Sequence, residues 1–216
     1  MSRSARPRSP SIGPRPSSAT SPVLDHFGVD RVHLVGHDWG GVIAWTVATT
    51  NPDRLASLTC LSTGHPAAYR DAGWAQREKG WHTLLFQFEI AGAWLLQDDA
   101  RNLREALTEH PDAEAAVERL RRPGAVDASL GLYRAWAPPE SLLARRHPYP
   151  SIPVPVMGVW STRDRFLTEE QMTGSAAYVS GPWRYERVEG VGHWLPLEAP
   201  AKITELLLGF LGSTGR

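Results

Sequence analysis

The sequence of 216 residues contains a single cysteine, Cys60. One cysteine excludes an intramolecular disulfide and any metal site built from several thiolates. It lies in the apolar run LASLTCLST, which predicts a buried and unreactive thiol. The sequence is therefore typical of a protein from a reducing compartment.

Charge imbalance and long apolar runs are also lacking. Lysine plus arginine and aspartate plus glutamate both total 23, so no net field favours nucleic acid. No stretch approaches the roughly 18 consecutive apolar residues that a membrane helix needs, and the N-terminus lacks the apolar core of a secretory signal. We expect a cytoplasmic protein that binds a small, apolar or weakly polar organic molecule and neither nucleic acid nor a membrane.

Residues 1–22 differ in composition from the rest of the chain. They contain four arginines, no acidic residue and little besides serine, proline and small side chains. Such a segment cannot bury a core, and its prolines would interrupt the amphipathic helix of a transit peptide. We predict a disordered, basic leader.

Four short apolar runs predict β-strands: RVHLVG from Arg31, LASLTCLST from Leu55, VPVMGVW from Val154 and WRYERVE from Trp183. A short helix that ends at Gly28 precedes the first run. The helix GGVIAWTVATT joins the first two runs, and LEAPAKITELLLGFL closes the chain as an amphipathic helix. The order strand, helix, strand is typical of a parallel sheet. We therefore predict an α/β fold with four mostly parallel strands flanked by helices, formed by residues 23–63 and 154–216.

Residues 64–153 show no comparable strand. Apolar residues recur there at helical spacing, as in WHTLLFQFEIAGAWLL, ARNLREALTEH and AEAAVERLRR. We predict that this stretch is a helical cap inserted into the α/β core.

The segment from Gly36 to Gly41, GHDWGG, lies directly between a predicted strand and a predicted helix. This position is typical of a nucleophile elbow, a strained turn that exposes its central side chain and needs small residues such as Gly36 and Gly40 around it. The central residue is Asp38, and a carboxylate there can attack an electrophilic carbon to form an ester. The amide of Trp39 and the helix dipole would stabilise negative charge. The alternative interpretation is that Asp38 caps the helix.

Hydrolysis of such an ester requires a base. His193 lies in the loop GVGHW after the last predicted strand, and Asp164 lies in STRD after the preceding strand. The order nucleophile, acid, histidine is the one that this fold uses. Asp164 could instead be an ordinary turn residue, but Asp98 and Asp99 are less suitable because they fall in the predicted cap.

The motifs GHDWGG, NPDRLASL, FQF, LYRA, STRDRF and GVGHW resemble the α/β-hydrolase superfamily over roughly residues 23–212. Within it they resemble the soluble epoxide hydrolases and the haloalkane dehalogenases. The resemblance implies that Asp38 is the nucleophile, that His193 activates water and that Asp164 orients the imidazole. It implies no metal and no organic cofactor, because a carboxylate, an imidazole and water suffice.

The resemblance also extends to the predicted cap. Epoxide hydrolases use two cap tyrosines to hold and protonate the epoxide oxygen, and Tyr133 in GLYRA matches the second. The first should lie four residues before the phenylalanine of FQ, where this sequence has His82, a donor with a different reach and a pH-dependent charge. In haloalkane dehalogenases the tryptophan after the nucleophile holds the halide. Trp39 fits that role, and Trp81 could assist, although packing of cap helices is its alternative interpretation.

Two features of the family are not found. No HGxP loop occurs in the expected place, and no strands precede the strand at Arg31. We therefore expect the C-terminal half of the fold, truncated at its N-terminal side, with an exposed sheet edge through which copies could associate. The leading hypothesis is an epoxide hydrolase-like enzyme. The alternatives are a haloalkane dehalogenase-like hydrolase and an inactive remnant, while a serine esterase is disfavoured because no GxSxG motif occurs.

Overall fold

The computed structural model describes residues 20–143 and 148–214. Most of the predicted leader, residues 1–22, lies outside the described residues. Its last three residues begin helix α1 (Thr20–His26). Gly28 follows in the left-handed region, with φ 63°, which confirms the short helix that the sequence ends at this glycine.

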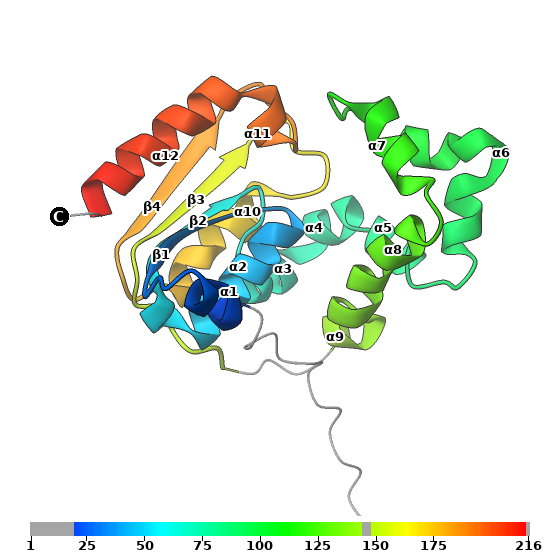
Figure 1. Cartoon of the computed structure of the whole chain (residues 1–216). Coiled ribbons are helices and arrows are strands. Elements are labelled where there is room, and N and C mark those ends of the chain that lie inside the picture. The colour runs from blue at the N-terminus through cyan, green and yellow to red at the C-terminus, as the bar shows by residue number, and fades with distance from the viewer. Residues whose placement is uncertain (1–19, 144–147, 215–216) are drawn as a thin grey trace, which may run out of the picture.

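A four-stranded sheet forms the core of the α/β part of the molecule, on the left in Figure 1. Its strands are β1 (Val32–His37), β2 (Leu55–Leu61), β3 (Val156–Ser161) and β4 (Trp183–Val188), in the spatial order β1-β2-β3-β4. Each neighbouring pair is parallel. All four predicted strands are therefore confirmed, and because they are parallel their carboxyl ends meet at one edge of the sheet.

Helices cover both faces of this sheet. Helix α2 (Trp39–Thr50) packs its buried Trp45 against the face that carries Leu58 and Cys60. Helix α12 (Pro200–Thr214) packs Leu206 against the opposite face, with Met157. The remaining core helices are η1 (Pro52–Arg54), α10 (Glu169–Thr173), η2 (Gly174–Tyr178) and α11 (Leu195–Glu198).

The Cys60 thiol is fully buried between β2 and α2, with its Sγ 3.9 Å from the carbonyl oxygen of Gly41. Burial raises the pKa of this thiol well above its ordinary value, because the thiolate would lose its hydration. The thiol therefore stays protonated and unreactive, as the sequence predicts.

Helices fill the chain between β2 and β3, and no strand occurs there within residues 62–143 and 148–155. They are α3 (Pro66–Asp71), α4 (Gly73–Lys79), α5 (His82–Leu85), α6 (Ala91–Ala106), α7 (Ala113–Leu120), α8 (Ala125–Trp136) and α9 (Pro139–Leu143). Helix α3 packs against α10 and η2 of the core, whereas α6, α7 and α8 contact one another and share an apolar cluster. We propose that the cap is built around α6–α8 and that α3 belongs with the core. None of the helices within residues 20–143 and 148–214 is both long and apolar enough to cross a membrane.

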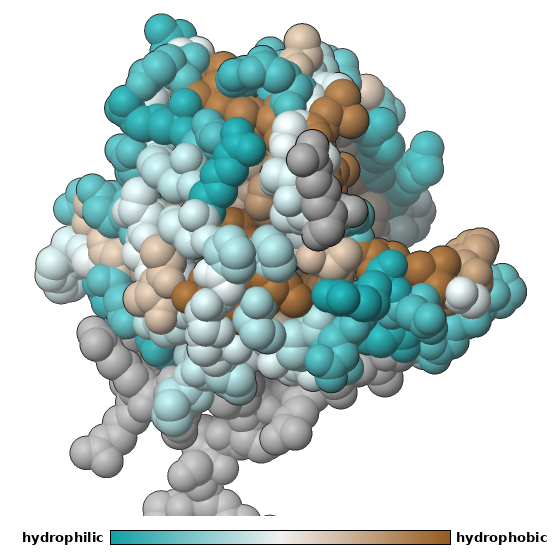
Figure 2. Space-filling model, turned by 90° about the vertical axis from the view of Figure 1, so that its left-hand side faces the viewer, coloured by the Kyte–Doolittle hydropathy of each residue, from teal (hydrophilic) through white to brown (hydrophobic). Residues whose placement is uncertain are grey.

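Strand β1 lies at an edge of the sheet and, among the described residues, pairs with β2 alone. Its sequence VHLVGH has no lysine, no acidic residue and no proline, and Val35 is 43% exposed. Other apolar residues also reach the surface, and Figure 2 shows groups of them among the hydrophilic residues of one side. Charged residues and prolines are the usual protection of a free edge, so we propose that β1 pairs with β1 of a second copy.

Replacing Val35 with lysine is expected to shift the protein toward the monomer. A twofold pairing of β1 with itself would bring like charges from the two copies close together, which weakens the pairing. Sedimentation velocity over a concentration series measures the effect. The control is Leu208→Lys, which adds the same charge on α12 at a residue that is 66% exposed. Equal association of the two variants and the unmodified protein would count against pairing through β1.

Candidate active site

Asp38 lies between the end of β1 and the start of α2, in a conformation that is rare for a non-glycine residue, with φ 50° and ψ −121°. Its side chain makes no capping hydrogen bond to α2, which argues against the helix-cap interpretation. Instead, 43% of its side-chain surface is exposed to a cavity between the core and the cap helices. Strained backbone of this kind is most frequent at functional sites. Here the unusual conformation directs the Asp38 carboxylate toward the cavity.

The elbow depends on a close crossing of two backbone segments. A Cβ atom at Gly36 would lie 2.3 Å from the carbonyl oxygen of Gly40, so only glycine fits there. A Cβ atom at Gly40 would meet nothing within 4 Å. The predicted need for small residues on both sides of Asp38 is therefore confirmed at Gly36 and not at Gly40.

Gly36→Ala is expected to destabilise the fold by about 1–3 kcal/mol, because the new methyl group overlaps backbone that cannot move without opening the elbow. Urea denaturation followed by tryptophan fluorescence gives the change in the free energy of unfolding. The matched control is Gly40→Ala, where the added methyl group meets open space at the start of α2. Equal losses in the two variants would contradict this account of the crossing.

His193 joins the two predicted carboxylates at the carboxyl ends of the strands. Its Nε2 lies 3.5 Å from Oδ1 of Asp38, and its Nδ1 lies 2.9 Å from Oδ2 of Asp164. Asp164 is buried, and its Oδ1 accepts hydrogen bonds of 2.9 Å from the amides of Phe166 and Leu167. The structure thus brings the three sequence-predicted residues together in one chain of contacts.

The two carboxylates stabilise the charged form of His193, and His193 stabilises the ionised form of Asp38. Burial on its own raises the pKa of the Asp38 carboxyl, but the hydrogen bonding and charge of His193, joined by the Trp39 amide, outweigh it and hold that pKa below its ordinary value. Burial on its own lowers the pKa of His193, whereas the hydrogen bonds and charges of Asp164 and Asp38 outweigh it and raise that pKa to about 9. At neutral pH the site therefore contains an ionised Asp38 beside an imidazolium.

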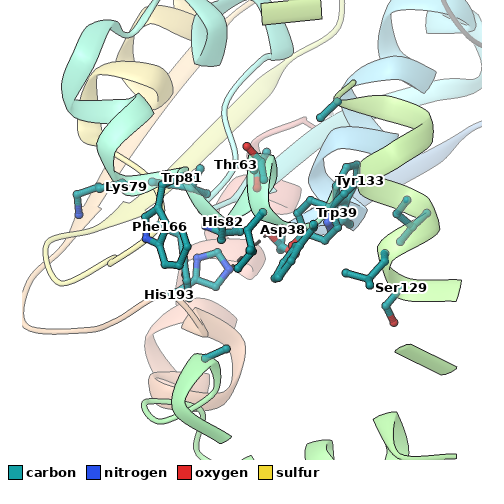
Figure 3. A pocket seen from close by; sticks show the side chains of 18 of the residues that line it. Asp38, Trp39, Thr63, Lys79, Trp81, His82, Ser129, Tyr133, Phe166 and His193 are labelled. Carbon is teal, nitrogen blue, oxygen red and sulfur yellow. Dashed lines mark ion pairs between the residues drawn. The ribbon is translucent and has the colours of Figure 1, made fainter. Parts of the chain in front are cut away.

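His82 from α5 and Tyr133 from α8 approach the same carboxylate from the cap, as Figure 3 shows. The ring centroids of these two residues lie 6.1 Å apart, and the ring of Trp39 packs edge-on against Tyr133 at 4.8 Å. Burial lowers the pKa of His82, and burial together with the Asp38 charge raises the pKa of Tyr133. A neutral imidazole and a protonated phenol both remain hydrogen-bond donors near Asp38.

The cavity above Asp38 has a volume of about 1160 Å³ and is lined mainly by apolar and aromatic side chains. Trp81 belongs to the lining but is 60% exposed, so it is not a packed core residue. Sequence reasoning missed Tyr69, which lines the cavity from α3 in a segment without a motif, and Phe166, whose ring lies 5.0 Å from that of His193. Phe166 could have been found, because it stands two residues after Asp164.

A parallel sheet with a strained, carboxylate-bearing turn at one strand end, and a histidine and a second carboxylate at the neighbouring ends, defines the α/β-hydrolase class. Sequence comparison agrees with this assignment: the alpha/beta hydrolase fold family matches residues 20–200. The chain belongs to this family.

Several relatives are epoxide hydrolases by name. The chain is 27% identical to epoxide hydrolase 3 of Xenopus tropicalis over 202 residues, which cover 86% of this chain and 54% of the frog protein. It is 29% identical to epoxide hydrolase A of Mycobacterium tuberculosis over 234 residues, covering 88% of this chain and 71% of that protein. The chain thus spans little more than half the length of the frog relative.

Solved structures share the fold. The structure of an epoxide hydrolase from Bacillus megaterium in complex with an inhibitor superposes with a TM-score of 0.79 at 21% identity, over 91% of this chain and 74% of that one. An identity at this level shows the common fold.

Proposed function

We propose that this chain hydrolyses epoxides through an ester on Asp38. The observation that carries the proposal is that a half-exposed, ionised Asp38 lies beside an imidazole held by Asp164, and that His82 and Tyr133, two hydrogen-bond donors of the cap, line the same cavity. Nucleophile, base and acid therefore all face one cavity. The similarity to proteins named epoxide hydrolases supports the same chemistry.

In the first step, a carboxylate oxygen of Asp38 attacks one ring carbon of the epoxide. A carbon–oxygen bond forms to the carboxylate, and the carbon–oxygen bond of the strained ring breaks. The released oxygen takes a proton from the Tyr133 hydroxyl, while His82 donates a hydrogen bond to it. The product is a hydroxyalkyl ester of Asp38.

In the second step, the neutral form of His193 takes a proton from water, and the resulting hydroxide attacks the ester carbon of Asp38. The Trp39 amide stabilises the negative oxygen of the tetrahedral intermediate. Collapse of the intermediate breaks its bond to the diol oxygen, which takes the proton of the newly added hydroxyl group. This releases the diol and restores the carboxylate, which now contains one oxygen from water. The proton held by His193 returns to the phenolate of Tyr133. Asp164 holds the imidazole so that Nε2 faces the reaction.

The walls of the cavity favour an apolar substrate. Trp94, Leu103, Leu130 and Trp136 line it, and its volume exceeds the range of roughly 300–1,000 Å³ that is typical of small-molecule sites. We infer that the substrate is a small organic epoxide with an apolar substituent that lies against the cap helices.

Isotope labelling tests the ester. A single turnover of an aryl epoxide in H₂¹⁸O, with protein in excess, should place ¹⁸O in the peptide that contains Asp38 and leave the first diol unlabelled. Direct attack of water on the epoxide would instead label the diol at once and leave the peptide unlabelled, and that result would refute the mechanism.

Tyr133→Phe is expected to slow ring opening by roughly 10²–10⁴-fold, because the variant loses the acid that protonates the leaving oxygen. Rapid-quench measurement of the formation of the Asp38 ester gives this rate. An alkyl halide of similar size is the control substrate, since a halide leaves without a proton and its rate should change little. Equal losses with both substrates would indicate that Tyr133 acts through packing.

A further inference from the structure

The backbone carbonyl of His193 is held by side chains from two other strand ends. Its oxygen lies 2.8 Å from Nε2 of His37, at the end of β1, and 2.9 Å from Oγ of Ser62, directly after β2. The amide of Leu195 also donates to it at 2.9 Å. Since Asp164 holds the other end of the same residue through Nδ1, both the backbone and the ring of His193 are fixed.

Ser62 is itself held in an unfavourable conformation. Its φ is 65°, in the left-handed region that non-glycine residues rarely adopt, and it is fully buried. Its amide donates to the carbonyl oxygen of Val159 at 2.8 Å, and its own carbonyl accepts from Nε2 of Gln171 at 2.9 Å. Gln171 is also fully buried and accepts from the amide of Gly64. Such strain persists only where surrounding contacts impose it, and here its result is a hydroxyl aimed at His193.

The hydrogen-bond partner of His37, the carbonyl oxygen of His193, determines which nitrogen of the His37 ring is protonated. A carbonyl oxygen only accepts hydrogen bonds, so Nε2 of His37 must carry a proton. Burial, together with the charge of His193, lowers the pKa of His37, although its contact with the His193 carbonyl and the charges of Asp38 and Asp164 oppose this. His37 therefore stays a neutral donor beside the imidazolium of His193, at a ring separation of 5.0 Å.

We propose that His37 and Ser62 are positioning residues that hold the His193 imidazole in place for the activation of water. The proposal rests on the ester mechanism above. In that mechanism Asp38 attacks the epoxide without a base, whereas hydrolysis of the ester needs the ring to align a water molecule. A misplacement of about 1 Å can cost on the order of 100-fold in rate. Loss of either donor should therefore slow the second step and leave the first step unchanged.

Rapid-quench kinetics with an aryl epoxide separates the two steps. His37→Phe and Ser62→Ala should form the Asp38 ester at the rate of the unmodified protein and hydrolyse it on the order of tenfold to 100-fold more slowly. The KM should fall together with kcat as the ester accumulates. His37→Gln, which keeps an N–H donor, should restore part of the rate. The control Ser213→Ala removes a hydroxyl that donates to the carbonyl of Phe210 on α12 and should change neither step.

Ser62→Gly separates strain from hydrogen bonding. Glycine accepts a φ of 65°, so this variant should be at least as stable as the unmodified protein and still hydrolyse the ester slowly. Normal hydrolysis in both Ser62→Gly and His37→Phe would overturn the proposal.

An NMR titration of His193 tests the positioning without turnover. In the unmodified protein the pKa of His193 is raised to about 9, largely by Asp164 and Asp38. If the imidazole of His193 is no longer fixed in position, its contacts with Asp164 and Asp38 should weaken. Its pKa should then fall toward the ordinary value of 6.5. An unchanged pKa in His37→Phe and in Ser62→Ala would overturn the inference, even if no epoxide reacts. Absence of an Asp38 adduct in every form, His193→Gln included, would instead refute the proposed function.

Discussion

His193→Gln is expected to trap the protein as an ester on Asp38. The amide cannot take a proton from water, so turnover should fall by about 10⁴-fold, the upper end of what a positioned base contributes. Attack by Asp38 on the epoxide should continue, because no base takes part in it. Intact-protein mass spectrometry should therefore show a stoichiometric adduct that equals the substrate in mass.

The matched control for this trap is His26→Gln, on the exposed helix α1, which should turn over substrate without accumulating an adduct. Peptide mapping should assign the adduct to Asp38. A His193→Gln protein that turns over normally, or that carries its adduct on another residue, would contradict the proposed role of His193.

Electrostatics explain how one imidazole serves both steps. In the free protein, Asp38 contributes to the raised pKa of His193, and the imidazolium in turn holds Asp38 ionised as a nucleophile. Ester formation removes the negative charge of Asp38, so one of the two carboxylates that raise the pKa of His193 is lost. The pKa falls, and a larger fraction of the imidazole is neutral when a base is needed. Ester hydrolysis should consequently speed up as the pH rises through the pKa that His193 has in the ester.

The three central residues of the site could be predicted from the sequence because each lies in a short motif that follows a predicted strand. Asp38 follows β1 directly, whereas Asp164 and His193 lie in the loops that follow β3 and β4, and parallel strands bring their carboxyl ends to one edge. The strand order therefore predicts that the three residues lie close together at this edge. The glycine at position 36 was likewise predictable, since an elbow has a fixed shape.

Contacts that depend on loop conformation could not be predicted in this way. The hydrogen bonds from His37 and Ser62 to His193 span 156 and 131 residues and depend on the path of the loop after β4. The helical pattern over residues 81–96 predicted one helix, whereas the chain forms α5 and then α6. Periodicity reveals helix formers, but the breaks between helices and the faces turned to the cavity follow from tertiary packing.

Asp164→Asn should abolish most activity although it changes only one atom. The Oδ1 of Asp164 accepts from the amides of Phe166 and Leu167, so the asparagine oxygen will take that position. Its NH₂ group must then face Nδ1 of His193, which has to accept rather than donate. The proton of the neutral ring moves to Nε2, and that nitrogen can no longer take a proton from water.

We expect turnover of the Asp164→Asn variant to fall by about 10⁴-fold, the cost of holding a catalytic histidine in the wrong tautomer. The Asp38 ester should accumulate, as in His193→Gln, and ¹⁵N NMR should report the Nε2–H tautomer of His193. Asp99→Asn is the matched control, because that side chain is 70% exposed on α6. A variant that keeps the Nδ1–H tautomer and yet loses activity would show that Asp164 acts by its charge alone. If the Asp164→Asn variant keeps both the Nδ1–H tautomer and full activity, Asp164 has no role in the mechanism.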